Sequence, residues 1–193
     1  MLKYFIITGL SIEHEVICMI VYEATKDEFI HDVFMDQVVD KIHTKYTEKI
    51  GRVNESELRS WENSLLYMSR VLNDKEIPGN AGVAIEFRIP YTSKRVDFLI
   101  SGRGDKKNSV IIVELKQWDY VEKVEGKEAI VKTVINRGLH ELTHPSYQAW
   151  SYAMLIQDYN EAVQNENIHL YPCTYLHNYR KKKDKDPLTD KIY

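Results

Sequence analysis

The chain has 193 residues, which is enough for one domain with a hydrophobic core, and 44% of them are hydrophobic. Its formal net charge of −3 excludes a broadly basic nucleic-acid binder, so any surface of that kind has to be a local patch. Its two cysteines, Cys18 and Cys173, exclude a disulfide framework and predict a cytoplasmic location, and no apolar stretch is long enough to predict a membrane helix.

The folded unit is predicted to start at Met19, where the residues up to Glu23 have the composition of a strand. Residues 1–18 match no strong pattern, and we interpret them as an N-terminal extension that an upstream mis-start would also explain. A capping box formed by Thr25 and Glu28 then predicts a helix, whose apolar positions recur at helical spacing up to Gly51.

A second capping box, from Asn54 to Glu57, predicts another helix with one apolar stripe, made of Leu58, Trp61, Leu65, Met68 and Leu72. At about 100° per residue, Glu57 lies roughly 50° from the centre of this stripe and Glu62 about 90°. Glu57 is therefore the better candidate for a carboxylate that leans into a site. The alternative is that the Glu57 carboxylate accepts a hydrogen bond from the backbone N–H of Asn54, as the third residue of the capping box.

Three strands are predicted next. Val83, Ile85, Phe87 and Ile89 alternate with Ala84, Glu86 and Arg88, which indicates a half-buried strand that ends at Pro90. Residues 96–100 and 110–115 are the following strands, and the turn between them is rich in Gly, Asp and Asn. Lys94 and Arg95, at the start of the second strand, could contact phosphate or could simply be solvated.

The last two strands predict a pair of carboxylates. Opposed residues of an antiparallel pair are equidistant from the turn centre, and the midpoint of positions 97 and 114 is 105.5, inside the turn. Asp97 is therefore expected opposite or diagonal to Glu114, with Lys116 on the same strand face as Glu114. Such a pair is costly unless a cation lies between the acids, and oxygen ligands suit Mg²⁺ or Mn²⁺. The alternative is that these are solvated charges at strand ends.

The remaining chain predicts an extra hairpin or irregular insertion between Val121 and Val134, a helix over Ser146–Val163 and a final strand over residues 168–176. Gln148 and Tyr152 lie one turn apart on the same face of that helix. They could orient a site, or they could be core packing and a surface amide. Residues 180–193 begin with Arg180 and three lysines and are interpreted as a charged tail, either solvated or in contact with phosphate.

The predicted order is helix, three strands, helix and strand, which makes an α/β (α+β) fold with a central mixed sheet flanked by helices. Asp97, followed after a hydrophobic strand by Glu114-Leu115-Lys116, resembles the PD-(D/E)xK nuclease signature, although Pro90 is too far upstream to serve as its proline. Gln148 and Tyr152 resemble the Q-x-x-x-Y motif of RecB-like members of that superfamily.

This resemblance implies an αβββαβ core and a metal held by Asp97, Glu114 and the backbone carbonyl of Leu115. It assigns catalysis to Asp97, Glu114 and Lys116. Glu57, Gln148 and Tyr152 would have supporting roles. Lys94 and Arg95, which flank Asp97, are the candidate contacts with nucleic acid.

A closer resemblance covers most of the domain predicted over residues 19–179. The strings IEFRIPYTSKRVDF, VIIVELKQW, HPSYQAWSYA and PCTYLHNY are similar to the N-terminal nuclease-like region of bacterial proteins that carry a Schlafen group 3-like P-loop helicase domain. The present sequence holds no G-x-x-x-x-G-K-[ST] motif, so ATP-driven activity is not carried over. A separately encoded helicase is the partner that the resemblance implies.

The expected function is therefore a Mg²⁺- or Mn²⁺-dependent nuclease acting on DNA or, as the less favoured substrate, RNA. The alternative is a catalytically silent module that keeps the nuclease fold and binds nucleic acid or a partner helicase. A third interpretation is a non-functional remnant of a larger protein.

Overall fold

The computed structural model describes residues 20–103 and 107–189. The predicted extension over residues 1–18, and Met19 as the start of the fold, lie outside the described residues. The elements in chain order are β1 (Tyr22–Thr25), α2 (Lys26–Phe34), α3 (Val38–Lys49), α4 (Glu55–Leu72), β2 (Gly82–Arg88), β3 (Arg95–Arg103), β4 (Asn108–Lys116), β5 (Glu122–Lys123), β6 (Ile130–Ile135), β7 (Gly138–Thr143), α5 (Pro145–Tyr159), α6 (Glu161–Asn165) and β8 (His169–Leu176).

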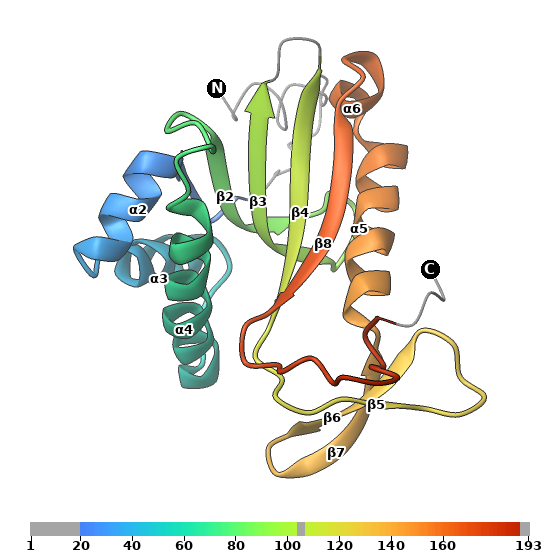
Figure 1. Cartoon of the computed structure of the whole chain (residues 1–193). Helices are drawn as coiled ribbons and strands as arrows, with labels where there is room; N and C mark the ends of the chain where they lie inside the picture. The colour runs from blue at the N-terminus through green and yellow to red at the C-terminus, as the bar shows by residue number, and fades with distance from the viewer. Residues whose placement is uncertain (1–19, 104–106, 190–193) are drawn as a thin grey trace.

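The main sheet is mixed and has the strand order β1-β2-β3-β4-β8 (Figure 1). The first four strands are antiparallel to their neighbours, and β8 runs parallel to β4 after the crossover through α5. The fold is thus α+β, with a mixed central sheet flanked by helices. The predicted order of helix, three strands, helix and strand is confirmed in α4, β2, β3, β4, α5 and β8.

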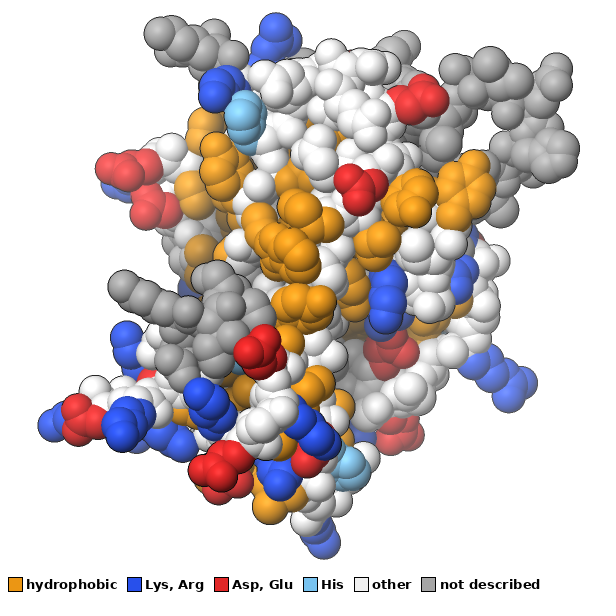
Figure 2. All heavy atoms as spheres, turned by 90° about the vertical axis from the view of Figure 1, so that its right-hand side faces the viewer, with side chains coloured by type: hydrophobic (Ala, Val, Ile, Leu, Met, Phe, Trp, Pro, Cys, Tyr) orange, Lys and Arg blue, Asp and Glu red, His pale blue; other side chains and the backbone are white. Residues whose placement is uncertain are grey.

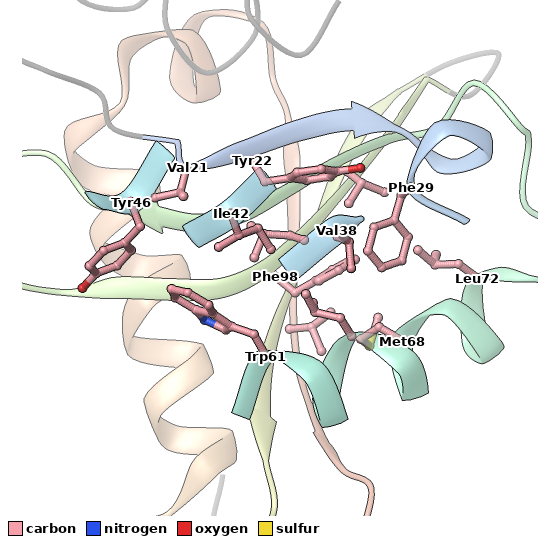
Figure 3. Packing of buried hydrophobic residues seen from close by; sticks show 14 residues of the cluster. Val21, Tyr22, Phe29, Val38, Ile42, Tyr46, Trp61, Met68, Leu72 and Phe98 are labelled. Atoms are coloured by element: carbon pink, nitrogen blue, oxygen red, sulfur yellow. The ribbon is translucent and has the colours of Figure 1, made fainter. Parts of the chain in front are cut away.

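One face of the sheet packs against α2, α3 and α4. Each of these helices turns an apolar stripe toward the strands, and their rings and aliphatic side chains interlock with those of β1 and β3 (Figure 3). Phe29 and Phe98 meet edge to face with ring centroids 5.3 Å apart, an arrangement that aromatic pairs favour. The burial of apolar area from these separate segments holds α4 in place against the sheet.

The opposite face packs against α5 and α6. Tyr152, Ala153 and Ile156 of α5 share a second buried cluster with Leu99 and Ile112 of the strands. Both faces of β3 and β4 are therefore covered, which explains why these strands contain few exposed positions.

The strand β2 differs from its predicted pattern. Val83 and Ile85 face the helices α2 to α4, as expected, but Phe87 and Ile89 lie in the cluster on the α5 side. The change of face occurs at Glu86, whose φ of 58° breaks the alternation of the strand. The prediction of a half-buried strand was wrong, because residues 83–87 are buried on both faces.

Two predicted helices are each divided in the structure. The helix expected from Thr25 to Gly51 forms α2 and α3, and Asp36 in the left-handed region (φ 55°) breaks it between them. The helix expected up to Val163 ends at Tyr159, and Asn160 caps the short α6 by accepting a hydrogen bond from the Val163 N–H. Apolar spacing alone did not reveal these breaks.

The capping boxes have different outcomes. Thr25 Oγ1 accepts from the Glu28 N–H and the Glu28 carboxylate accepts from the Thr25 N–H, so this capping box is confirmed. The Asn54 side chain accepts from the Glu57 N–H at 2.8 Å, but the Glu57 carboxylate does not return the bond.

The connection between β4 and α5 forms the small sheet β5-β6-β7. The sequence predicted its first two strands as a hairpin but not β7. The chain after β8 folds back against this sheet (Figure 1). Lys182 Nζ donates to the Val121 carbonyl at 2.9 Å, and Asp186 is buried. The expectation of a solvated tail agrees with residues 180–185, which are exposed, but is wrong for Asp186.

No helix within residues 20–103 and 107–189 is long and apolar enough to cross a membrane.

Candidate functional site

Two acidic side chains come together where β3 and β4 separate. The ladder between β3 and β4 ends at the pair Phe98 and Val113, so the next step in register places Asp97 opposite Glu114. Asp97 Oδ2 accepts a hydrogen bond from the Leu115 N–H at 2.9 Å, which replaces a ladder bond with a side-chain bond. The hairpin geometry expected from the sequence is thus confirmed. It follows from the register of β3 and β4.

Glu114 is almost fully buried, with 2% of its surface exposed. Its Oε1 accepts hydrogen bonds from Lys116 Nζ at 2.6 Å and from Gln148 Nε2 at 2.5 Å. Its Oε2 is buried, and none of the described residues donates a hydrogen bond to it. A buried carboxylate oxygen without a donor is costly unless it is protonated or a cation binds it.

The two acids perturb each other's ionisation. Burial, and after it the charge of Asp97, raise the pKa of Glu114 to about 8. Burial also raises the pKa of Asp97, although Lys116 and the Leu115 N–H act in the opposite direction. Like charges that converge in a poorly solvated place cannot both ionise without compensation, so the pair holds a proton near neutral pH unless a cation replaces it.

Lys116 supplies part of that compensation. Burial lowers its pKa, but the charges of Glu114 and Asp97 outweigh burial, so the pKa is raised and the amine stays protonated. The ammonium also lies 5.7 Å from the ring centroid of Trp118, a cation–π contact. Lys116 and Glu114 share one face of the strand, as their spacing predicts.

The helix α5 contributes Gln148 and Tyr152 to the same place. Besides its bond to Glu114, Gln148 Nε2 donates to the Tyr152 Oη at 3.0 Å. Both N–H groups of the amide are therefore in use, which fixes its orientation. The structure therefore places Gln148 and Tyr152 beside Glu114, as predicted, and Gln148 holds Glu114 Oε1 in position.

Glu57 and Arg95 meet each other beside this centre. Arg95 Nη2 pairs with Glu57 Oε1 at 2.7 Å, its Nη1 donates to the Tyr46 Oη at 3.0 Å, and its Nε pairs with Glu86 Oε2. Arg95 is thus engaged inside the fold by three partners, and its charge lowers the pKa of Asp97. Lys94, the other predicted phosphate contact, is exposed.

Glu86 is a component of the site that the sequence analysis missed. The pairs Ile85–Phe98 and Phe87–Val96 flank it, so Glu86 lies opposite Asp97 in the register of β2 and β3. Trp61 Nε1 donates to Glu86 Oε1 at 2.8 Å, and burial raises the pKa of Glu86 to about 7. The turn arithmetic could have found it, because the midpoint of 86 and 97 is 91.5, inside the predicted turn over residues 91–94.

A magnesium or manganese ion fits the donors at this place. Asp97 and Glu114 offer hard oxygen ligands, and the buried Glu114 Oε2 lacks a donor. Within the described ranges no three Asp, Glu, His or Cys side chains gather as a metal cluster. Mg²⁺ nevertheless binds commonly through one or two carboxylates, and water and substrate phosphate complete its coordination. The Leu115 carbonyl is a further ligand candidate, because the N–H and C=O of an extended residue point toward the same neighbouring strand.

The arrangement combines two acids, a protonated amine and an oriented amide at one end of the main sheet. Such a set can bind a divalent cation and present a positive group to an anionic substrate. Comparisons of the chain with models of protein families, with curated proteins and with solved structures gave no match.

Proposed function

We propose that this chain is a metal-dependent nuclease of the PD-(D/E)xK type that hydrolyses phosphodiester bonds in DNA or RNA, with DNA the favoured substrate. One observation carries the proposal: Asp97, Glu114, Lys116 and Gln148 converge although they come from two strands and a helix. The element order around them, α4-β2-β3-β4-α5-β8, supports the αβββαβ core that the sequence motif implies.

Each residue has a role in this proposal. Asp97, Glu114 and the Leu115 carbonyl hold Mg²⁺ or Mn²⁺, which when bound lowers the pKa of a coordinated water and neutralises charge on the phosphate. Lys116 holds the attacking water or a phosphate oxygen with its compact positive charge. Gln148, steadied by Tyr152, holds Glu114 Oε1 and thereby leaves Oε2 for the ion. Glu57 acts through Arg95 rather than as a ligand.

The alternative is a silent module that binds nucleic acid or a separately encoded helicase without cutting. Two observations favour this alternative. The Glu57 carboxylate forms an ion pair with Arg95, and the Lys116 amine forms one with Glu114. Against it, a module that only binds phosphate has no use for two converging acids, since uncompensated carboxylates repel a polyanion.

The cytoplasmic location remains a prediction from cysteine content.

The deciding experiment is a cleavage assay on labelled single- and double-stranded DNA and RNA with Mg²⁺ or Mn²⁺. We expect metal-dependent cleavage by the wild type and a loss of about 10²–10³-fold in Lys116→Met and in Glu114→Gln. The matched controls are Lys75→Met and Glu62→Gln, which change exposed residues away from the acids and are expected to cleave normally. Equal cleavage by Lys116→Met and the wild type would exclude the proposed centre.

Metal binding separates the nuclease from the silent module when no cleavage is found. A ligand that binds only the native state raises its melting temperature. Millimolar Mg²⁺ or Mn²⁺ should stabilise the wild type, and Asp97→Ala should lose this shift while Glu62→Gln keeps it. An unchanged melting temperature in the wild type would leave the acids without the ion that the mechanism requires.

A further inference from the structure

A basic hollow of about 860 Å³ lies between the small sheet and the segment that follows β8. Its lining includes five lysines and two acidic residues, so charges of +5 and −2 leave +3 in a chain whose net charge is −3. These residues are Lys123, Lys181, Lys182, Lys183, Lys185, Glu122 and Asp186. The lower part of Figure 2 shows Lys and Arg side chains interspersed with Asp and Glu side chains, below the apolar side chains over α5. The residues that line the hollow therefore carry a net positive charge, opposite in sign to the net charge of the whole chain.

The hollow has a fixed wall. Asp186, which is 4% exposed, accepts from the Lys182 N–H at 2.7 Å and from the Leu188 N–H at 2.9 Å. The Lys182 ammonium bonds the Val121 carbonyl and lies 5.5 Å from the Tyr120 ring centroid. The negative charge of Asp186 is thereby satisfied inside the wall, and the exposed lysines on either side of it face solvent.

One wall of the hollow continues β4, which carries Glu114 and Lys116, and the other continues its parallel neighbour β8. Lys116 ends β4, and Glu122 follows six residues later. Leu176 pairs with Lys116 at the end of β8, and Lys181 follows five residues after it. Five extended residues span at most about 18 Å. This upper limit corresponds to about five base-pair steps along the axis of B-form DNA, where the rise is about 3.4 Å.

We propose that this hollow binds the phosphate backbone of the nucleic acid a few nucleotides away from the bond held at Glu114 and Lys116. The inference rests on the proposed nuclease function and assigns it a substrate-positioning surface. Lys181, Lys183 and Lys185 contact phosphates, and Lys182 is structural because its amine is engaged by Val121 and Tyr120. Contacts of this kind carry no base specificity, so the hollow sets affinity and register on the strand.

The test measures binding and not cleavage, so that it stands apart from the test of the nuclease. Fluorescence anisotropy follows the binding of labelled 20-nucleotide single strands and duplexes, in EDTA, over a range of NaCl concentrations. The triple variant K181Q/K183Q/K185Q should bind at least about tenfold more weakly. Its plot of log affinity against log salt should lose about 0.7–0.9 in slope for each phosphate contact removed.

Two further variants keep the result interpretable. K45Q/K75Q/K107Q removes the same charge from exposed positions elsewhere, of which Lys107 directly precedes β4 at the end opposite to Lys116. This variant should bind like the wild type. K181R/K183R/K185R preserves the charge and should retain binding. Equal affinity and equal salt slope in the K181Q/K183Q/K185Q variant and in the wild type would overturn the proposal, as would a wild type that binds no oligonucleotide. Absent cleavage with intact lysine-dependent binding would instead count against the nuclease alone.

Discussion

Glu114 and Glu86 lie in the fold at positions where ionisation is costly. The pKa of Glu114 is raised to about 8 and that of Glu86 to about 7, and burial is the largest cause of both shifts. Because the folded-state pKa values exceed the ordinary value of a glutamate, the folded protein binds more protons than the unfolded chain at intermediate pH. The stability from these protons is complete below about pH 4.5 and is lost as the pH rises through 7 and 8.

We therefore expect the metal-free protein to become less stable between about pH 5 and pH 8.5. The loss should be about 2–4 kcal/mol, which lowers the melting temperature by roughly 5–10 °C. Melting curves in EDTA across this range measure it. Glu114→Gln should flatten the dependence, because an amide does not titrate, whereas the exposed Glu62→Gln should not. A melting temperature that is constant in the wild type would contradict the assigned protonation.

Arg95 is expected to matter for stability more than for nucleic acid binding. Arg95→Met would leave the buried Glu86 without its ion-pair partner, a change that costs about 3 kcal/mol or more. Urea denaturation measures the loss. Lys94→Met, at the exposed neighbour, is the matched control and should change stability by less than about 0.5 kcal/mol. Similar effects of the two substitutions would show that the Arg95 contacts contribute little.

The role of Glu57 can be separated from that of a metal ligand. Glu57→Gln should keep the stabilisation by Mg²⁺, because the Glu57 carboxylate pairs with Arg95 and not with the ion. Asp97→Ala should lose it. Thermal melts of both variants with and without Mg²⁺ give the answer. If Glu57→Gln removed the Mg²⁺ shift, Glu57 would have to move to the metal when it binds.

At the scale of the elements, the break between α2 and α3 depends on Asp36. Its φ of 55° costs a side chain with a Cβ about 1 kcal/mol, and more when the Cβ is branched. Asp36→Gly should leave the free energy of unfolding unchanged or raise it, and Asp36→Val should lower it by about 1–2 kcal/mol. The residue is exposed, so urea denaturation reports the backbone effect directly. Equal stability of the two variants would contradict a left-handed break.

The elements also show what the sequence could and could not predict. Asp97 and Glu114 were paired correctly because a hairpin register follows from local numbering and a turn-rich segment. The reversal of faces at Glu86 was missed because it comes from a single φ angle, and the residues on either side of it still alternate in polarity. The partners of Glu57 and Arg95 depend on how α4 packs on the sheet, and no local spacing encodes that contact.

At the scale of the whole molecule, Asp186 holds together the chain after β8, and Lys182 of the same segment bonds the Val121 carbonyl beside the small sheet. Replacing Asp186 with alanine removes the acceptor for the Lys182 and Leu188 N–H groups and for the Tyr179 hydroxyl. Asp186→Ala should therefore speed tryptic cleavage near Arg180 and Lys181 several-fold, with little change in melting temperature, because the main clusters are untouched. Asp184→Ala changes an exposed neighbour and is the control. Equal cleavage rates would mean that this segment is held by other contacts.

The acids Asp97 and Glu114 belong to one hairpin, 17 positions apart (114 − 97), whereas Gln148 is 34 positions beyond Glu114. Local pairs of this kind form within microseconds, long before a helix can dock from a distant part of the chain. The two carboxylates therefore meet early, while Gln148 and the covering helices are still absent. While the carboxylates are solvated their repulsion is weak, and it becomes costly only when α5 and the other helices exclude water from them. We therefore expect a proton or a divalent cation to favour the docking of these helices rather than the pairing of the two strands.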